Sequence, residues 1–386
     1  MNAESSYPSA RQSCNATLGP QTMHNQMLLI AVLAFGVAAL LSLLLRAPAH
    51  KLGLVDHPDA RKTHPTPTPL TGGIAIFLAF SIGLTLAGNS TPGLLVILGG
   101  GAFLVLLGLL DDIYQLHYRT RLAGQAAAAA CLVIGADVHV DTLGNLFGLG
   151  PVDLGPFAIL FSIFAVVGLI NAINMLDGLD GLAGSVACVS LAGVLLLADA
   201  VAPALTMPAA ILAAAILGFL TVNIRFPWRK RAHVFMGDAG STFLGYCLAW
   251  FVIALPQQAP AEVPPIAALW LVGLPVADTL ATIWRRKRQG LSAFEAGHNH
   301  IHHLLQRAGF SVNVTLLIIV LAAILFVSIA LDRVLWQSLP EPALFALYVL
   351  ALAVTYKLLE QVAPRRRLWR RQRAKRRAEP AYSKRG

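Results

Sequence analysis

The sequence predicts an all-α, polytopic membrane protein with about eleven transmembrane helices. Of its 386 residues, 56% are hydrophobic and only 12% are charged, and the mean hydropathy is +0.67. Soluble domains carry about 25% charged residues. Apolar runs of about 20 residues, long enough to cross the hydrocarbon core of a bilayer, recur between polar breaks or breaks that contain Gly and Pro. We expect spans near residues 25–46, 73–88, 93–110, 122–136, 155–173, 182–200, 204–223, 239–256, 264–283, 313–332 and 340–358.

The distribution of Lys and Arg predicts the orientation of these spans. Apart from Arg11 and Arg333, every basic residue falls on one side of the predicted bundle or at the helix ends of that side. Residues 137–154, on the other side, include three Asp residues but no Lys or Arg. Loops rich in Lys and Arg stay in the cytosol. An odd number of spans then places the N-terminus outside and the C-terminus inside.

We expect one membrane-embedded domain over residues 25–360, with a mobile N-terminal tail at 1–24 and an Arg-rich cytosolic tail at 361–386. The Arg-rich tail largely accounts for the net charge of +10. We interpret it as an anchor for orientation and for anionic lipid. Nucleic-acid binding is not expected, because no folded surface bearing aromatic residues accompanies the tail.

Two neighbouring carboxylates, Asp111 and Asp112, end the third predicted span. Carboxylates at a membrane boundary are costly unless a cation compensates them. The cation could be a divalent metal, a basic substrate, or the nearby Arg119 and Arg121. The alternative is an ordinary solvated helix end.

The end of the fifth predicted span carries Asn171, Asn174 and Asp177 at three-residue steps, which places them on one helix face. Asp180 would continue that face, although Gly178 and the glycine at 181 are expected to break the helix there. Converging amide and carboxylate oxygens are suited to a hard cation such as Mg²⁺. Structural hydrogen bonds between helices are the alternative.

The segment before the eighth predicted span reads Phe235-Met-Gly237-Asp238-Ala-Gly240. The two glycines would let backbone amides approach an anion at a helix N-terminus, and Asp238 could bind the metal that this anion chelates. Phe235 could stack on a planar base. A simple N-cap is the alternative for Asp238.

Two further cytosolic segments are basic. Arg61 and Lys62 lie beside glycines in the first loop and could hold phosphate oxygens. The second segment is rich in histidine. It is better suited to phosphate contacts or proton transfer than to a zinc site, because no cysteine is placed to act as a further zinc ligand. Its histidines are His298, His300, His302 and His303. A basic loop or helix end without a ligand is the alternative for both segments.

Neither a Gly-x-x-x-x-Gly-Lys-[Ser/Thr] loop nor a Gly-x-Ser-x-Gly turn occurs in the sequence. ATP hydrolysis and serine acyl transfer therefore lack their usual residues. The remaining carboxylates, amides, histidines and basic side chains are typical of metal-assisted attack on a phosphoryl group.

The ordered motifs resemble the polyprenyl-phosphate N-acetylhexosamine-1-phosphate transferases, in particular the undecaprenyl-phosphate GlcNAc-1-phosphate transferase branch. The resemblance covers about residues 53–303. It rests on Asp56-x-Pro-x-x-Arg-Lys, Asp111-Asp112, Asn171-x-x-Asn-x-x-Asp-Gly-x-Asp-Gly, Gly237-Asp238-x-Gly-Ser and His300-x-His-His. The resemblance implies eleven helices with a cytosolic active-site cleft, in the inner (plasma) membrane of a bacterium.

The resemblance also implies a reaction and a role for each matching residue. UDP-N-acetylhexosamine and undecaprenyl phosphate, the latter drawn from the lipid bilayer, would give undecaprenyl-diphospho-HexNAc and UMP. Asn174 and Asp238 would hold Mg²⁺, for which Mn²⁺ could substitute. The catalytic residues would be Asp111, which activates or orients the lipid phosphate, with Asp112, Asp177, Asp180, His302 and His303. The substrate-binding residues would be Arg61, Lys62, Asn171, Phe235 and His300.

Two features favour a UDP-HexNAc donor, with GlcNAc as the first candidate. The histidine segment reads His-Ile-His-His, and no Lys follows Asp112. The alternative within the family is phospho-MurNAc-pentapeptide translocase. A secondary transporter is the alternative outside it, but the acids do not lie at mid-span and no motif repeats between the two halves. No motif specifies the sugar further, or an oligomeric state.

Overall fold

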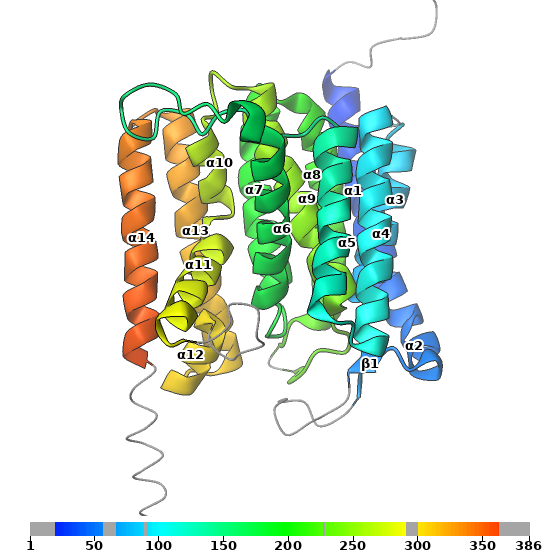
Figure 1. The fold of residues 1–386 in the computed structure, drawn as a ribbon. Helices are drawn as coiled ribbons and strands as arrows, with labels where there is room; N and C mark the ends of the chain where they lie inside the picture. The colour runs from blue at the N-terminus through cyan, green and yellow to red at the C-terminus, as the bar shows by residue number, and fades with distance from the viewer. Residues whose placement is uncertain (1–19, 57–66, 89–90, 227, 291–299, 363–386) are drawn as a thin grey trace, which may run out of the picture.

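The computed structural model describes residues 20–56, 67–88, 91–226, 228–290 and 300–362, which form one bundle of helices with a two-stranded ribbon at one end (Figure 1). The first helices are α1 (Pro20–Leu44), α2 (Arg46–Leu52), α3 (Gly72–Leu86), α4 (Pro92–Tyr114), α5 (Tyr118–Ala130), α6 (Ala158–Leu176) and α7 (Leu182–Val201). The others are α8 (Thr206–Asn223), α9 (Gly237–Gln258), α10 (Pro265–Leu271), α11 (Gly273–Arg288), α12 (Ile301–Ala308), α13 (Val312–Leu335) and α14 (Glu341–Val362).

The remaining elements are short. A π-helical turn (Cys131–Gly135) continues α5, and 3₁₀ turns precede α6 (Gly155–Phe157) and α8 (Pro203–Leu205). Strands β1 (Val55–Asp56) and β2 (Thr68–Pro69) pair antiparallel, with Val55 opposite Pro69.

The all-α membrane fold is confirmed, and a helix or helix pair occupies each of the expected span positions. Eight helices in the described chain are long and apolar enough to cross a membrane, or nine if α10 and α11 form one span. The other two positions are filled by α3, which has 15 residues, and by α5 with its π-helical turn. α1 begins at Pro20, slightly before the expected domain boundary at 25.

The expected straight span at 264–283 is wrong in shape, because α10 and α11 meet at an angle of 84°. The break follows Val272 and precedes Gly273, whose Cβ position is filled by Phe326 of α13 and Tyr348 of α14. The hydroxyl of Tyr348 donates to the Gly273 carbonyl at 3.0 Å. This bond ties α14 to the first residue of α11 inside the bundle.

α9 forms the centre of the bundle, with 94% of its apolar window buried against α3, α4, α6, α7 and α10. Glycines let three of these helices approach its backbone. A Cβ on Gly73 of α3 would lie 2.2 Å from the Gly240 nitrogen, and one on Gly108 of α4 would lie 2.4 Å from the Ala239 backbone. A Cβ on Gly245 of α9 would lie 2.6 Å from the Cα of Ile170 in α6.

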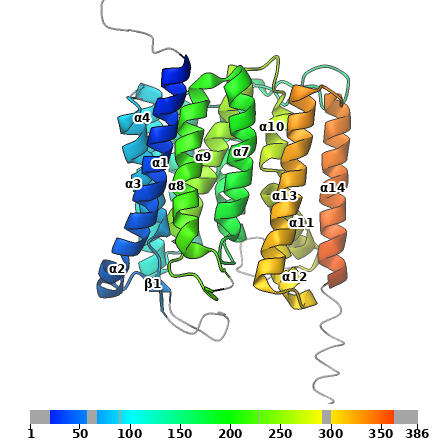
Figure 2. The same ribbon diagram turned by 180° about the vertical axis from the view of Figure 1, so that it is seen from behind.

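The two ends of the bundle differ in charge. α1 begins at one end and α14 finishes at the other, where α2, β1 and α12 also lie (Figures 1 and 2). We call this second end the basic end, because it includes Arg46 and Lys51 of α2 and residues 285–288 at the end of α11. The loop from 137 to 154, with its three Asp residues, closes the opposite end.

Replacing Gly108 with Ala should lower the thermal stability, because the new Cβ would meet the α9 backbone, which cannot move aside as a side chain can. Overpacking of this kind costs about 1–3 kcal/mol. Gly99→Ala on the same helix is the matched control, since nothing lies within 4 Å of its Cβ position. Thermal unfolding of the purified protein in detergent compares the two. Equal unfolding midpoints would contradict the close approach of α4 and α9.

Candidate active site

A cavity of about 2430 Å³ runs along the bundle from polar side chains at the basic end to residues 139–146 near the opposite end. The site residues expected from the sequence and described in the structure all line it. They are Asp111, Asp112, Asn171, Asn174, Asp177, Asp180, Phe235, Asp238, His300, His302 and His303. Arg61 and Lys62 lie outside the described residues.

Asp111 and Asp112 lie in the last turn of α4, which ends where Gln115 adopts a left-handed conformation (φ 52°). The carboxylate of Asp111 accepts the Leu116 N–H at 2.8 Å and pairs with the Arg121 guanidinium at 2.8 Å. Arg121, one of the compensating cations suggested by the sequence, therefore balances Asp111 and fixes its orientation.

Asp238 lies in the first turn of α9, directly after Gly237, which has a φ of 75° that favours glycine. Its backbone N–H donates to Asp112 Oδ1 at 3.1 Å, and its carboxylate lies 3.6 Å from Arg121. The chain thus brings Asp238 and Asp112, 126 positions apart in sequence, into contact. The neighbouring Gly240 instead faces Gly73 of α3, so its small size serves helix packing.

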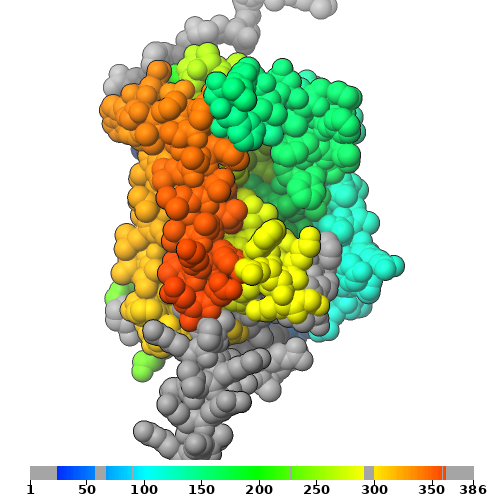
Figure 3. All heavy atoms as spheres, turned by 60° about the vertical axis from the view of Figure 1, so that its left-hand side comes forward, coloured from blue at the N-terminus to red at the C-terminus, as the bar shows by residue number. Residues whose placement is uncertain are grey.

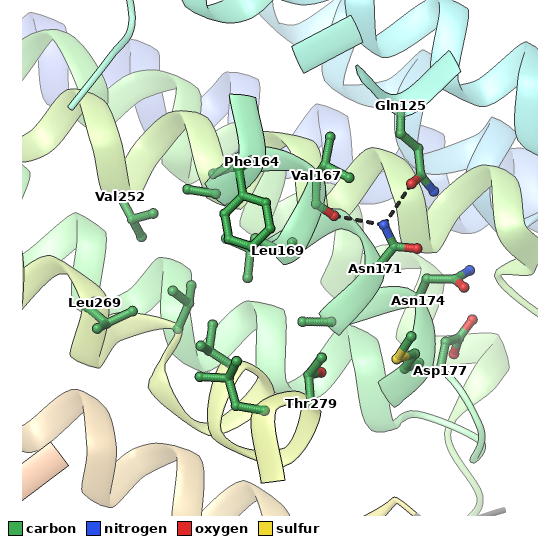
Figure 4. Close-up of a pocket in the computed structure, with 18 of the residues that line it drawn as sticks. Gln125, Phe164, Val167, Leu169, Asn171, Asn174, Asp177, Val252, Leu269 and Thr279 are labelled. Atoms are coloured by element: carbon green, nitrogen blue, oxygen red, sulfur yellow. Dashed lines mark hydrogen bonds between the residues drawn. The ribbon is translucent and has the colours of Figure 1, made fainter. Parts of the chain in front are cut away.

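Asn171 and Asn174 lie on the last two turns of α6, on the same helix face as the sequence predicts (Figure 4). The Asn171 amide donates to the Gln125 side chain at 2.7 Å and to the Val167 carbonyl at 2.8 Å. The Asn174 amide donates to Asp238 Oδ1 at 2.8 Å and to Ser241 at 2.9 Å. Asn174 therefore links the end of α6 to the start of α9.

Asp177 and Asp180 follow the end of α6 and lie in different surroundings. Burial, followed by the nearby Asp238 and Asp180 carboxylates, raises the pKa of Asp177 to about 7. Asp180 is 8% exposed and accepts from Arg225 at 2.6 Å and from the Ala232 N–H at 3.0 Å. The helix ends at Leu176, so Asp180 does not continue the face of Asn171 and Asn174.

The histidine segment packs against this turn at the start of α12. His302 is 1% exposed, and its ring occupies the space where a Cβ on Gly178 would lie, 2.2 Å from Nε2. The rings of His302 and His303 have centroids 4.1 Å apart. Gly178 therefore lets α12 approach the loop that carries Asp177.

Phe235 lies half-buried on the loop before α9 and is fixed by backbone hydrogen bonds. Its N–H donates to the Pro69 carbonyl at 2.8 Å, and its carbonyl accepts from the Gly72 N–H at 3.0 Å. The ribbon and the start of α3 thus hold the aromatic side chain at the cavity.

The oxygen atoms near Asp238 fit a magnesium ion that phosphate oxygens and water would complete. Asp112 Oδ2 is buried and has no hydrogen-bond partner in the described chain. The Asp238 carboxylate and the Asn174 amide adjoin it, and rotation of that amide by 180° would present its oxygen. Within residues that the structure describes, no group of three or more His, Cys, Asp or Glu is arranged to hold a metal by itself. Mg²⁺ is usually bound by one or two carboxylates together with substrate phosphates.

The other side of the cavity is apolar. Phe164 and Leu169 of α6, Val252 of α9 and Leu269 of α10 face the same space as Asn171 (Figure 4). The molecular surface is hollowed between α14, α11 and the green helices beside them (Figure 3). Phe164 is 73% exposed on this side, so the cavity opens toward the lipid as well as toward the basic end.

The fold and the site together define a membrane-embedded glycosyl transferase. The chain belongs to glycosyl transferase family 4, whose family description matches residues 94–256. This range contains both carboxylates of α4 and the whole stretch from Asn171 to Asp238.

Three relatives carry the name undecaprenyl-phosphate alpha-N-acetylglucosaminyl 1-phosphate transferase. The Escherichia coli O157:H7 protein is 34% identical over 79% of this chain and 83% of its own length. The Yersinia pestis protein is 34% identical over 84% of this chain and 88% of its own. The Pasteurella multocida protein is 36% identical over 79% of this chain and 86% of its own length. The similarity thus extends over most of the chain.

The sequence did not single out Asp278 of α11, which is 2% exposed. Its carboxylate lies 2.8 Å from His300 Nδ1 and accepts the Ile301 N–H at 2.9 Å. A lone acid inside an apolar run is costly unless it is paired, and this cost is the signal that could have identified it. Gln125 and Ser241, the partners of Asn171 and Asn174, carry no such signal because they are uncharged.

Replacing Asp278 with Ala should lower the free energy of unfolding by about 1–3 kcal/mol, because the buried His300 ring and the Ile301 N–H lose their acceptor. Thermal unfolding of Asp278→Ala, His300→Ala and the double variant measures the coupling. We expect the double variant to lose less stability than the sum of the single losses. Fully additive losses would show that the two side chains do not depend on each other.

Proposed function

We propose that this chain transfers an N-acetylhexosamine 1-phosphate, with GlcNAc 1-phosphate as the first candidate, from a UDP-sugar to undecaprenyl phosphate. The products are undecaprenyl-diphospho-HexNAc and UMP, and the reaction starts a cell-surface polysaccharide such as an O-antigen. Family membership and the activity for which the three relatives are named support this choice over the translocase and the transporter.

The observation that carries the proposal is the single cavity that joins a carboxylate and amide cluster to an apolar groove. A polyprenyl chain enters the groove from the lipid side, past Phe164, Leu269 and the broken helix formed by α10 and α11. Its phosphate then reaches the end of α4. The nucleotide sugar, which is soluble in water, enters from the basic end, so the two phosphates meet at Asp111, Asp112 and Asp238.

The reaction is an attack by a lipid phosphate oxygen on the phosphorus that bears the sugar. The bond from that phosphorus to the bridging oxygen breaks, and UMP leaves with this oxygen. When the lipid phosphate is a dianion, the charges balance without any proton transfer. Asp111, held by Arg121 and Leu116, orients the lipid phosphate. It accepts a proton only when this phosphate arrives as a monoanion.

The main barrier to the attack is the repulsion between two anionic phosphates, which cations reduce. Asn174 and Asp238 would hold Mg²⁺, or Mn²⁺ in its place, which neutralises charge on the diphosphate when bound. Asp112 supports this centre by accepting the Asp238 N–H.

The donor is held on the opposite side of the cluster. Phe235 packs on the uracil, while His300, His302 and His303 contact the diphosphate together with Arg61 and Lys62. Asp177 binds the sugar side, and Asn171 with its partner Gln125 lines the same space. Asp180 acts through Arg225 and the Ala232 N–H, so we assign it a positioning role on the loop that carries Phe235.

The basic end faces the cytosol in this proposal, since basic loops stay on that side and UDP-sugars are made there. α1 then begins on the outer side of the inner membrane, and α14 ends on its cytosolic side. The opposite positions of these two helix ends in the bundle support this arrangement.

The test is transfer of labelled GlcNAc 1-phosphate from UDP-GlcNAc to undecaprenyl phosphate by the purified protein. Label in the lipid and an equal amount of UMP should appear only when Mg²⁺ and the lipid acceptor are both present. Chelation of the metal should stop the transfer, and Mn²⁺ should restore it. No UMP from any UDP-N-acetylhexosamine under these conditions would reject the proposal.

In this assay Asp238→Ala should lower kcat by at least about 100-fold, because the diphosphate charge loses its metal ligand and Asn174 loses its acceptor. Asp199→Ala is the matched control, since Asp199 is an exposed acid at the end of α7, outside the cavity. Turnover near the wild-type value in the Asp238 variant would remove the metal assignment and leave the reaction class intact.

A further inference from the structure

A second cavity, of about 390 Å³, lies at the basic end and shares no lining residue with the active-site cavity. It lies between the start of α2, strand β2 and the loop that joins α8 to α9. We call it the basic pocket. Its lining residues are Arg46, His50, Pro67, Thr68, Pro69, Trp228, Arg229, Lys230, Arg231, Ala232 and His233.

The basic pocket concentrates positive charge. Four Arg or Lys residues and two His residues line it, and no Asp or Glu does so within the part of the chain that the structure describes. The Arg46 Nε atom is buried and has no acceptor among these residues. The pKa of His233 is lowered by burial and then by the charges of Arg229 and Arg46. The pocket therefore has the electrostatic character of an anion site.

The loop holds part of this charge in a fixed position. The Arg229 guanidinium donates to the carbonyls of Thr221 and Ile224 at the end of α8 and lies 5.0 Å from the Phe226 ring centroid. Phe226 and Arg229 also exchange two backbone hydrogen bonds of 2.9 Å each. An arginine held in this way loses little further side-chain entropy when it meets an anion.

The position of the basic pocket at the end of α1 indicates a membrane lipid as the source of the anion. The apolar stretch of α1 ends at Leu44, two residues before Arg46, and Leu40 and Leu44 are 55% and 60% exposed. Trp228 is 82% exposed and stacks on Phe226 with an angle of 4° between the rings. Exposed Trp beside basic residues is typical of the interface between lipid and water.

We propose that the basic pocket binds the phosphate headgroup of an anionic phospholipid, whose acyl chains lie along the exposed leucines of α1. Arg46 and Lys230 contact the phosphate from opposite walls, one from α2 and one from the α8–α9 loop. Basic pockets between helices at the cytosolic side of a membrane bind such headgroups. Arg and Lys bind phosphate through charge-assisted hydrogen bonds.

Occupation of the basic pocket also acts on the active site. Pro69 lines the pocket, and its carbonyl accepts the Phe235 N–H at 2.8 Å. His233, on the opposite wall, precedes Phe235 by two residues and Asp238 by five. A bound headgroup thus holds the loop in place between β2 and α9. The effect on catalysis rests on the proposed function, whereas lipid binding does not.

The test measures binding of phosphatidylglycerol to the full-length protein in zwitterionic detergent, by native mass spectrometry and by the shift of the thermal unfolding midpoint. Arg46→Gln with Lys230→Gln should weaken binding roughly tenfold or more and remove the shift. The matched control, Lys287→Gln with Lys357→Gln, removes two charges of α11 and α14 outside the basic pocket and should bind like the wild type. If the double pocket variant does not fold, Lys230→Gln alone, at an exposed position, replaces it and should show a smaller loss.

Two outcomes would overturn the lipid site. Equal losses in the pocket and control variants would show diffuse attraction between charges. Binding of glycerol 3-phosphate or inorganic phosphate that matches phosphatidylglycerol in affinity, at equal ionic strength, would assign the basic pocket to a soluble phosphate. Neither readout depends on UMP release. Failure of the lipid site would therefore leave the proposed function intact, and failure of the proposed function would leave the lipid site intact.

Discussion

The hydrogen bond between Asn174 and Asp238 determines the geometry of the active site, because it joins the last turns of α6 to the first turn of α9. The Asp238 N–H extends the connection to Asp112 on α4. These bonds form only if the three backbones approach closely. Gly108 and Gly245 allow this approach, since a Cβ at either position would meet a neighbouring backbone within 2.6 Å. The polar cluster and the packing of α9 thus depend on each other.

The same cluster brings four carboxylates to the end of an apolar bundle, and the residues that the structure describes balance only part of their charge. Arg121 pairs with Asp111 and lies 3.6 Å from Asp238, whereas Asp112 Oδ2 has no hydrogen-bond partner among the described residues. Burial of such groups without a cation is unfavourable. In the proposed reaction, a metal and two phosphates would supply the missing interactions. Burial, and after it the charges of Asp238 and Asp180, raises the pKa of Asp177 in the same cluster.

The sequence predicts the helices well because the length and hydropathy of each apolar run are enough to identify a membrane span. It also predicts the shared face of Asn171 and Asn174, because their three-residue spacing within one helix is a local property. It fails where the outcome depends on distant residues. The break at Gly273 brings Phe326 and Tyr348, which lie more than 50 positions away, into the space beside it. Asp180 turns to Arg225, 45 positions away, and Asp278 pairs with His300, 22 positions away. No local pattern encodes these partners.

The broken helix explains how one cavity can serve both a lipid and a soluble substrate. A straight span through residues 264–283 would pack along its whole length, whereas the 84° bend directs α11 away from α10 and leaves space beside Leu269 and Val276. The same bend brings Asp278 to His300, so the helix that borders the apolar groove also anchors the histidine segment. A lipid that moves α11 would therefore move the histidines as well. In the proposed reaction, α11 would therefore link acceptor entry to the contacts of the donor.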